Sequence, residues 1–421
     1  MKIEEEKKIA IFAGTTEGRL LAERLAGSNV RADVFVATED GKEEIVGGIG
    51  EEDLVYITLP YISSAREGVI RLGSLLEKYG TYEMNGIAFQ DVNEIWWLET
   101  IGGHHWIAKR VPDDRYVVMP NQFGIDDFDL NDAFSEQNEH MCSSDLREFI
   151  AENHLDLSLN GGNGSHFDAR AAFESHSDSD HIYNTPRAWF MERYFNPKTK
   201  KWDGSDADYR PESDDIPWSM VPEKKITVED VKYVLSSHYQ GTPYDPYAAY
   251  GDKSWKGAYR SIGVNRTDFL SVIQMRPDHK GDNGILQWIA FASNAFNVLV
   301  PFYTDVTTTP EYLSNTTGEV STDNFYWASR MVAAMADASY KSSIFHIERY
   351  QEKVMAKGHA LIHQYDALLA GETDETKQTQ LREEANNKIA EMLKKETGAT
   401  LHKVLFELSN QMKNAYSRSD A

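Results

Sequence analysis

Between residues 86 and 119 the chain carries short runs rich in aromatic and β-branched residues, separated by polar turns, and this pattern constrains the fold most. The runs are Gly86–Phe89, Glu94–Thr100, His105–Val111 and Tyr116–Met119. Short strands joined by turns of a few residues form antiparallel sheets, because parallel strands need long crossover connections. The sequence therefore predicts an antiparallel meander in this part of the chain.

Helical patterns lie on both sides of the meander. One helix is predicted over Ser63–Tyr79, where apolar residues share one face and Gly80 ends the pattern. Residues 120–225 are predicted to be rich in loops. The further expected elements are a short helix over Leu146–Asn153, a helix from Val228 to about His238 capped by Thr227 with Asp230 in a capping box, strands near Phe269–Met275 and Leu286–Ala292, and mostly helix from Thr322 to Tyr416, with Asp374–Lys395 as a solvated helix. This order of segregated elements indicates the α+β class.

The first 46 residues differ from the rest of the chain in their pattern of apolar runs. Two apolar runs, Ile9–Ala13 and Val34–Ala37, flank a glycine-containing loop and a helical pattern, which together predict a βαβ unit. One such unit buries too little surface to be a domain. We therefore expect a short fragment over residues 1–46 and a larger domain over residues 47–421, with 321–421 mainly helical.

Composition limits the classes of partner. The 43 basic and 67 acidic residues give a net charge of −24, which argues against nucleic acid or an anionic membrane surface. No apolar run approaches the roughly 20 residues of a membrane span. Cys142 is the single cysteine, so neither an intrachain disulfide nor a cysteine zinc cluster is expected. We expect a cytoplasmic protein without a cofactor or metal. A homo-oligomer is compatible with the sequence, which does not decide the oligomeric state.

Several longer strings resemble one enzyme family. They are EIWWLETIGGHHWIAKRVPDDRYVVMPNQ (94–122), YNTPRAWF (183–190), SSHYQGTPYD (236–245), QWIAF (287–291), VPFY (300–303) and SRSDA (417–421). Residues 47–421 resemble the cysteine dipeptidases of the N-terminal-nucleophile type, the family of lactobacillus dipeptidase A and the secernins. The resemblance implies an αββα sandwich, and hydrolysis of small dipeptides by acyl transfer.

The same resemblance implies that a cysteine at the start of the mature chain is the nucleophile and that its α-amino group is the base. The segment that would carry this cysteine is absent from the sequence, so we expect the nucleophile to be missing and turnover to be impaired. Two minor candidates remain. Cys142 lies just before a predicted helix and near His140, which would favour its thiolate, and Thr15 would become a nucleophile if the chain were cleaved before it.

Four residues of the resembling region are candidates for the site. The resemblance implies that Asn121 binds the oxyanion of the tetrahedral intermediate, a role suited to an amide that donates without titrating; a turn asparagine after Pro120 is the alternative. Arg187, Arg260 and Arg266 are candidates for binding a substrate carboxylate, or else they are surface or structural arginines.

Other polar groups point less clearly to chemistry. His104 and His105 are adjacent, so on a strand at most one of them can face a pocket. The acidic loop with Asp178, Asp180 and His181 could hold a cation, although a solvated loop is the simpler interpretation.

The N-terminal fragment leaves two alternative functions open. Its loop, with Gly14, Thr15, Thr16 and Gly18, could hold a phosphate at a helix N-terminus or be a plain glycine turn. The string resembles the start of precorrin-6A reductases, which implies an NADPH-dependent oxidoreductase. Because only half of such a site is present, we expect no useful NADPH binding. The other alternative is a catalytically dead fusion of two partial genes.

Overall fold

The computed structural model describes residues 9–12, 32–35, 48–157, 164–174, 177–279 and 281–413. The chain forms two compact units that are each discontinuous in sequence. Unit 1 consists of Met1–Pro112 and Ile125–Glu174, and unit 2 consists of Asp113–Gly124 and Ser175–Ala421. The expected boundary near residue 46 lies between described segments and stays a prediction.

Unit 1 contains a four-stranded antiparallel sheet in the order β3-β4-β5-β7. Its strands are β3 (Gly86–Gln90), β4 (Ile95–Gly102), β5 (His105–Arg110) and β7 (His140–Cys142). The first three confirm the meander. The fourth expected strand is wrong as a member of this sheet, because Tyr116–Val117 forms β6, which pairs in unit 2 with β8 (Ser219–Met220).

Strand β7 occupies the place beside β5 that the sequence had suggested for the fourth run. The carboxylate of Asp132 accepts hydrogen bonds from the backbone N–H groups of Glu139 and His140, both at 2.8 Å. These bonds fix the approach of the chain to β5, where Ile107 pairs with Cys142. Hydrogen bonds from a side chain to backbone groups seven or eight residues later produce no periodic pattern in the sequence, so β7 could not be predicted from periodicity.

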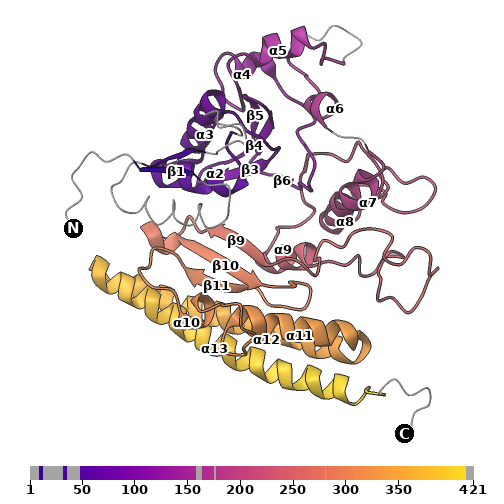
Figure 1. Ribbon diagram of the computed structural model, residues 1–421, viewed down its shortest axis with the longest axis vertical. Coiled ribbons are helices and arrows are strands. Elements are labelled where there is room, and N and C mark those ends of the chain that lie inside the picture. The colour runs from indigo at the N-terminus through magenta and orange to yellow at the C-terminus, as the bar shows by residue number, and fades with distance from the viewer. Residues whose placement is uncertain are drawn as a thin grey trace. The chain divides into compact units, whose positions relative to one another are not determined.

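Helix α3 (Ala65–Tyr79) packs against the sheet of unit 1 (Figure 1). Ser64 caps its first turn by accepting from the N–H of Glu67, and Gly80 ends it with φ of 73°. Its apolar face is almost fully buried, in a cluster with two sheet tryptophans, Trp96 and Trp106. Burial of such side chains contributes about 1.5–3 kcal/mol each to stability. Three further helices of the unit are α4 (Leu130–Ala133), α5 (Leu146–Glu152) and α6 (Ala169–Phe173), and α2 (Glu51–Thr58) and η1 (Leu59–Tyr61) precede α3.

The N-terminal fragment contributes two strands to unit 1. β1 (Ile9–Phe12) and β2 (Ala32–Phe35) pair in parallel, as the predicted βαβ pattern requires. Within the described ranges they form a sheet of their own. The predicted helix between them, and the loop residues Gly14, Thr15, Thr16 and Gly18, lie outside the described residues.

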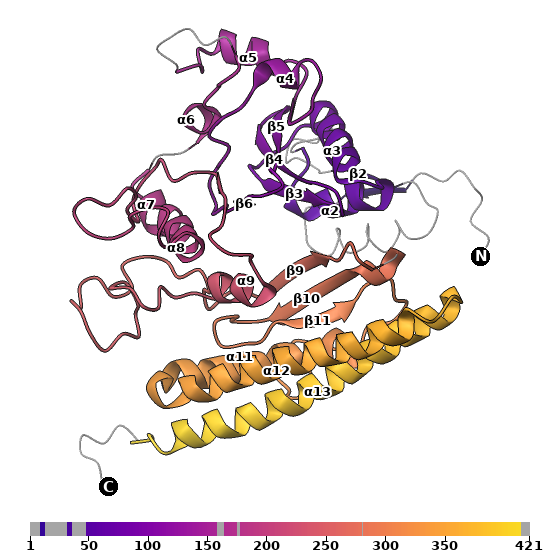
Figure 2. The same cartoon turned by 180° about the vertical axis from the view of Figure 1, so that it is seen from behind.

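Unit 2 is built on a three-stranded antiparallel sheet covered by long helices (Figures 1 and 2). The strands are β9 (Phe269–Met275), β10 (Ile285–Phe291) and β11 (Val300–Tyr303), and the helices are α11 (Phe325–Ala338), α12 (Tyr340–Leu369) and α13 (Glu375–Ser409). Helix α13 is not the fully solvated helix that its charge suggested, because Ala385, Ile389 and Leu393 are buried in the core beside α12 and β11. Most of its charged residues occupy the other positions of the helix, while the buried Arg382 and Glu396 form ion pairs with Asp305 and Lys357.

The rest of unit 2 carries shorter elements. They are α7 (Asp180–Tyr183), α8 (Thr185–Phe195), α9 (Val228–Leu235), η2 (Gly281–Gly284) and α10 (Glu311–Ser314). The capping box of α9 is confirmed, since Thr227 and Asp230 exchange side-chain to backbone hydrogen bonds. Helix α8 was not expected in the loop-rich region. No helix in the described part of the chain is long and apolar enough to cross a membrane. The α+β class is confirmed, whereas the packing of the two larger sheets as a sandwich stays a proposal because they belong to different units.

Candidate functional site

The start of helix α8 in unit 2 fixes the position of Arg187. Asn184, buried just before this helix, donates from Nδ2 to the Asp180 carboxylate at 2.5 Å, which orients the amide. Its Oδ1 accepts from Nη2 of Arg187 at 2.7 Å. The Nε of Arg187 donates to the carbonyl of Tyr183, one turn back. The guanidinium is therefore held from two sides by the turn that begins the helix.

Asn121 meets the same guanidinium from another segment of unit 2. It follows β6, and its Oδ1 accepts from Nη2 of Arg187 at 2.7 Å. The side chain is exposed, and its amide N–H₂ makes no hydrogen bond to any residue that the structure describes. Arg187 thus orients Asn121 so that two N–H donors are directed away from the guanidinium and are open to a ligand.

Arg260 lies beside Arg187. Its backbone N–H donates to the carbonyl of Ile182 at 3.1 Å, and its own carbonyl accepts from the hydroxyl of buried Tyr239 at 2.7 Å. Tyr239 has φ of 66°, a conformation that bulky residues rarely adopt. These backbone contacts bring a second guanidinium to the start of α8.

The two arginines form a region of uncompensated positive charge. Burial, together with the charge of Arg260, lowers the pKa of Arg187 to about 10, so the Arg187 guanidinium stays protonated at neutral pH. Neither makes an ion pair within the described ranges. The amide oxygens around Arg187 satisfy its hydrogen bonds without neutralising it. An anionic group of a ligand is therefore favoured here.

The third candidate, Arg266, shares no contact with Arg187 or Arg260 among the described residues. Arg266 is exposed in the segment before β9 and forms no hydrogen bond or ion pair with described residues. The structure thus brings together Asn121, Arg187 and Arg260, and it adds Asn184 and Tyr183. Asn184 was not predicted, although it stands within the quoted string YNTPRAWF.

Cys142 is buried at the end of β7 in unit 1. Burial, and then the negative charge of Glu77, raise the pKa of its thiol to about 12. The next helix begins at Leu146, as predicted, and the pKa of the thiol is nevertheless raised. His140 is occupied with Asp132, its Nδ1 lying 3.2 Å from the carboxylate. The single cysteine is therefore an inert core thiol at neutral pH.

The remaining polar candidates serve structural contacts. His104 hydrogen-bonds the carbonyl of Glu77 through Nδ1, and His105 stacks on Phe149 with ring centroids 3.9 Å apart. In the acidic loop, His181 pairs with Asp214 at 2.9 Å. Among the residues that the structure describes, no group of three or more histidine, cysteine or acidic side chains is arranged to hold a metal ion.

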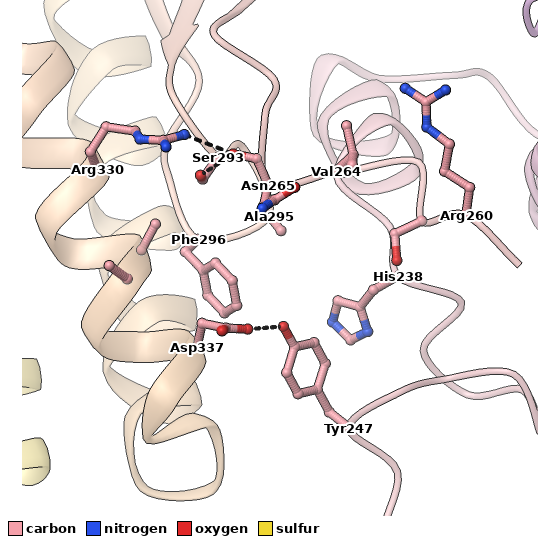
Figure 3. A pocket seen from close by; sticks show the side chains of 14 residues that line it. His238, Tyr247, Arg260, Val264, Asn265, Ser293, Ala295, Phe296, Arg330 and Asp337 are labelled. Atoms are coloured by element: carbon pink, nitrogen blue, oxygen red, sulfur yellow. Dashed lines mark hydrogen bonds between the residues drawn. The ribbon is translucent and has the colours of Figure 1, made fainter. Parts of the chain in front are cut away.

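A cavity of about 600 Å³ in unit 2 was not predicted from the sequence (Figure 3). His238, Tyr247, Arg330 and Asp337 are among the side chains that line it. The string SSHYQGTPYD contains His238 and Asp245, whose Nδ1 and Oδ1 atoms lie 3.0 Å apart. The available signal was thus a histidine and an aspartate seven residues apart, which by itself specifies no cavity.

Comparison with known proteins gives one consistent group. Residues 26–353 match the profile of peptidase family C69. A dipeptidase of Bifidobacterium longum is 50% identical over 452 aligned residues, which cover 99% of this chain and 84% of that protein. A probable dipeptidase A of Streptococcus pyogenes is 50% identical over 377 residues, 89% of this chain and 75% of that protein. Dipeptidase A of Lactobacillus helveticus is 42% identical over 320 residues, 76% of this chain and 64% of that protein.

Proposed function

The chain belongs to peptidase family C69, and we propose that it acts on dipeptides, hydrolysing their single amide bond by acyl transfer. The relatives that support this substrate class are named dipeptidases. The observation in the structure that carries the proposal is the adjacent pair of Arg187 and Arg260 without a carboxylate partner in the described ranges. A dipeptide presents its terminal carboxylate close to the scissile bond, and two guanidinium groups would hold it.

Asn121 completes the proposed site. Its amide oxygen is bound by Arg187, so its N–H₂ group is left to donate to the oxyanion that forms on the attacked carbonyl. In a dipeptide the attacked carbonyl and the terminal carboxylate are about one residue apart, roughly 3.5 Å of extended chain. A donor anchored on the carboxylate-binding arginine is therefore near the reacting atom. Arg266 would add only long-range attraction.

The origin of the nucleophile is a separate part of the proposal. The family resemblance implies the αββα sandwich and a cysteine whose own α-amino group is the base. Cys142 does not meet this requirement, because its thiol is buried and its pKa is raised to about 12. We therefore propose that this chain turns over dipeptides slowly. A cytoplasmic location also stays a proposal, resting on the single cysteine.

A dipeptide panel tests the function. The purified chain and its Cys142→Ala variant are incubated with unblocked dipeptides and with N-acetylated and C-amidated forms, and release of amino acids is measured. We expect weak turnover of unblocked dipeptides, lower still for the amides, and no change in Cys142→Ala. Robust turnover that disappears in Cys142→Ala would show that Cys142 is the nucleophile. Turnover indifferent to the terminal carboxylate would refute the role of the arginine pair.

A further inference from the structure

The cavity of Figure 3 carries charged groups of both signs at its two ends. Arg330 and Asp337 project from the same helix, α11, seven residues apart, with the small side chains of Ala333 and Ala334 between them. Seven residues of helix span about 10.5 Å and nearly two turns, so the two side chains share one face. Neither forms an ion pair within the part of the chain that the structure describes.

The cationic end is held by a tight turn. Nη1 of Arg330 donates to the carbonyl of Asn265 at 2.8 Å, and the hydroxyl of Ser293 donates to the same carbonyl at 2.8 Å. Ser293 and its neighbour Ala292 both have positive φ, 48° and 52°. Two consecutive residues in this conformation are uncommon, and such strain tends to persist where a site depends on it. The guanidinium keeps its Nη2 and Nε donors for a ligand.

The anionic end is held by an aromatic wall. The hydroxyl of Tyr247 donates to Oδ1 of Asp337, which leaves Oδ2 available. The Tyr247 ring stacks on Tyr340 with centroids 3.9 Å apart and packs edge-on against His238. Asp245 accepts from the backbone N–H of Tyr247 at 2.9 Å and pairs with His238 at 3.0 Å. Asp337 is thus positioned by a network that is itself fixed at each step.

An apolar surface separates the two charges. Phe296 lies between Arg330 and Asp337 in Figure 3, with Ala333 and Val264 also lining the space. Arg260 also lines the cavity, and in the same view its guanidinium points away from His238 and Tyr247. Across the apolar floor the cavity offers the guanidinium of Arg330 and the carboxylate of Asp337, with Arg260 as a second cationic lining residue. This combination matches a molecule with a carboxylate, an ammonium group and an apolar side chain.

We propose that this cavity binds a free α-amino acid with an apolar side chain, as its zwitterion, with the carboxylate on Arg330 and the ammonium group on Asp337. One residue with a hydrogen bond at each end spans roughly 9 Å, close to the separation of the two positions on α11, whereas a dipeptide is about 3.5 Å longer. The volume of about 600 Å³ is within the range of small-molecule sites. The inference goes beyond the proposed hydrolysis and does not depend on turnover.

Calorimetric titration of the full chain tests the proposal with three probes, L-leucine, N-acetyl-L-leucine and L-leucinamide. The acetyl compound lacks the ammonium group and the amide lacks the carboxylate. We expect leucine to bind and each analogue to bind at least about tenfold more weakly, because each loses a charge-assisted hydrogen bond. In Arg330→Gln, leucine and leucinamide should bind equally weakly, and in Asp337→Asn, leucine and N-acetyl-leucine should do so. Arg330→Lys should keep part of the preference.

Arg349→Gln is the matched control, because it removes a guanidinium on α12 that does not line the cavity. Leucine affinity within about threefold of wild type in this variant, with preserved thermal unfolding in all variants, would show that the losses in Arg330→Gln and Asp337→Asn arise in the cavity and not from a changed net charge. The proposal is overturned if leucine does not bind at about 10 mM, if the three probes bind alike, or if leucyl-leucine binds here and leucine does not. Loss of dipeptide turnover with intact leucine binding would affect the proposed function alone.

Discussion

Cys142 in unit 1 and Arg187 in unit 2 are ionisable side chains that the sequence suggests as functional candidates. Burial shifts the pKa of each in the direction that disfavours its charged form. The thiol begins near 9 and is raised to about 12, so it is neutral at physiological pH. The pKa of the guanidinium is lowered from its usual range to about 10, so the group stays charged. Burial therefore keeps the Cys142 thiol uncharged, whereas the Arg187 guanidinium stays charged and can bind an anion.

The surroundings of the two groups sharpen the contrast. Arg187 donates to the amide oxygens of Asn121 and Asn184 and to a backbone carbonyl, and these acceptors support its charge. The thiol of Cys142 lies in the sheet core, with Glu77 opposing a thiolate and only Arg147 favouring it. A sequence shows which groups could ionise, whereas the fold decides which of them remain charged.

The largest expected effect is on thiol reactivity. At pH 8 a thiol with a pKa of about 12 is about 0.01% thiolate, against roughly 10% for a thiol near 9, so native Cys142 should react with iodoacetamide about a thousandfold more slowly than the unfolded chain. Mass spectrometry of native and guanidinium-denatured samples measures this ratio. Equal rates in the two samples would show that the fold does not suppress ionisation of the Cys142 thiol.

The same pKa shift fixes a pH dependence of stability. Because the folded pKa lies above the unfolded value, the contribution of the thiol is fully present below about pH 9 and is lost as pH rises toward 12. The difference in the free energy of unfolding between wild type and Cys142→Ala should therefore change only above about pH 9. A change between pH 5 and 8 would contradict the assignment.

The second effect is on ligand affinity. Arg187→Ala should weaken the binding of an unblocked dipeptide by about a hundredfold, because it removes a charged donor to the carboxylate and the anchor of Asn121. Isothermal titration measures the dissociation constants. Arg193→Ala on the same helix is the control and should bind the dipeptide normally, because Arg193 pairs with Asp203 and lies over the Trp189 ring, away from Asn121. Equal losses in the two variants would indicate damage to α8 rather than to a binding site.

A smaller effect on dipeptide affinity is expected at Asn184, which contacts Arg187. Asn184→Ala removes one of the acceptors of Arg187, while those from Asn121 and Tyr183 remain. We expect a loss of dipeptide affinity of about tenfold and a decrease in the free energy of unfolding of about 1–2 kcal/mol. Titration and chemical denaturation measure the two quantities. An affinity loss as large as that of Arg187→Ala would mean that Asn184 itself contacts the ligand.

The smallest effect is expected at Arg266. This arginine is exposed and has no hydrogen bond or ion pair in the described part of unit 2, so Arg266→Ala should change dipeptide affinity by less than about twofold. The comparison is best made at low and at physiological ionic strength, because long-range attraction is screened by salt. A tenfold loss at both would place Arg266 in the site with Arg187 and Arg260.

Local signals account for what the sequence predicted correctly. The face of α3, the glycine at its end and the capping box of α9 each depend on residues within a few positions of one another. Strands β9 and β10 were also found, because their apolar runs are bounded by turns. The helical C-terminal region followed from its residue spacing, although the burial of one face of α13 depends on core partners far away in sequence.

Non-local contacts account for what was missed. β7 has three residues and depends on the Asp132 carboxylate, and β6 and β8 have two residues each and pair across about a hundred positions. The arginine cluster was predicted in part, because family strings carried Asn121 and Arg187. Its uncompensated charge could not be predicted, since that depends on which carboxylates the fold brings near. The cavity likewise combines α11 with loops from three separate segments.

The crossing of the chain between the two units has a consequence for synthesis on the ribosome. The twelve-residue excursion that carries Asn121 belongs to unit 2, yet it is made before the last fifty residues of unit 1. Its partner strand, β8, emerges about a hundred residues later, a delay of roughly 5–20 s at ordinary elongation rates. During that interval β6 lacks its partner strand, and the arginine cluster can assemble only after Arg260 has been made, when all of unit 1 but only part of unit 2 has been translated.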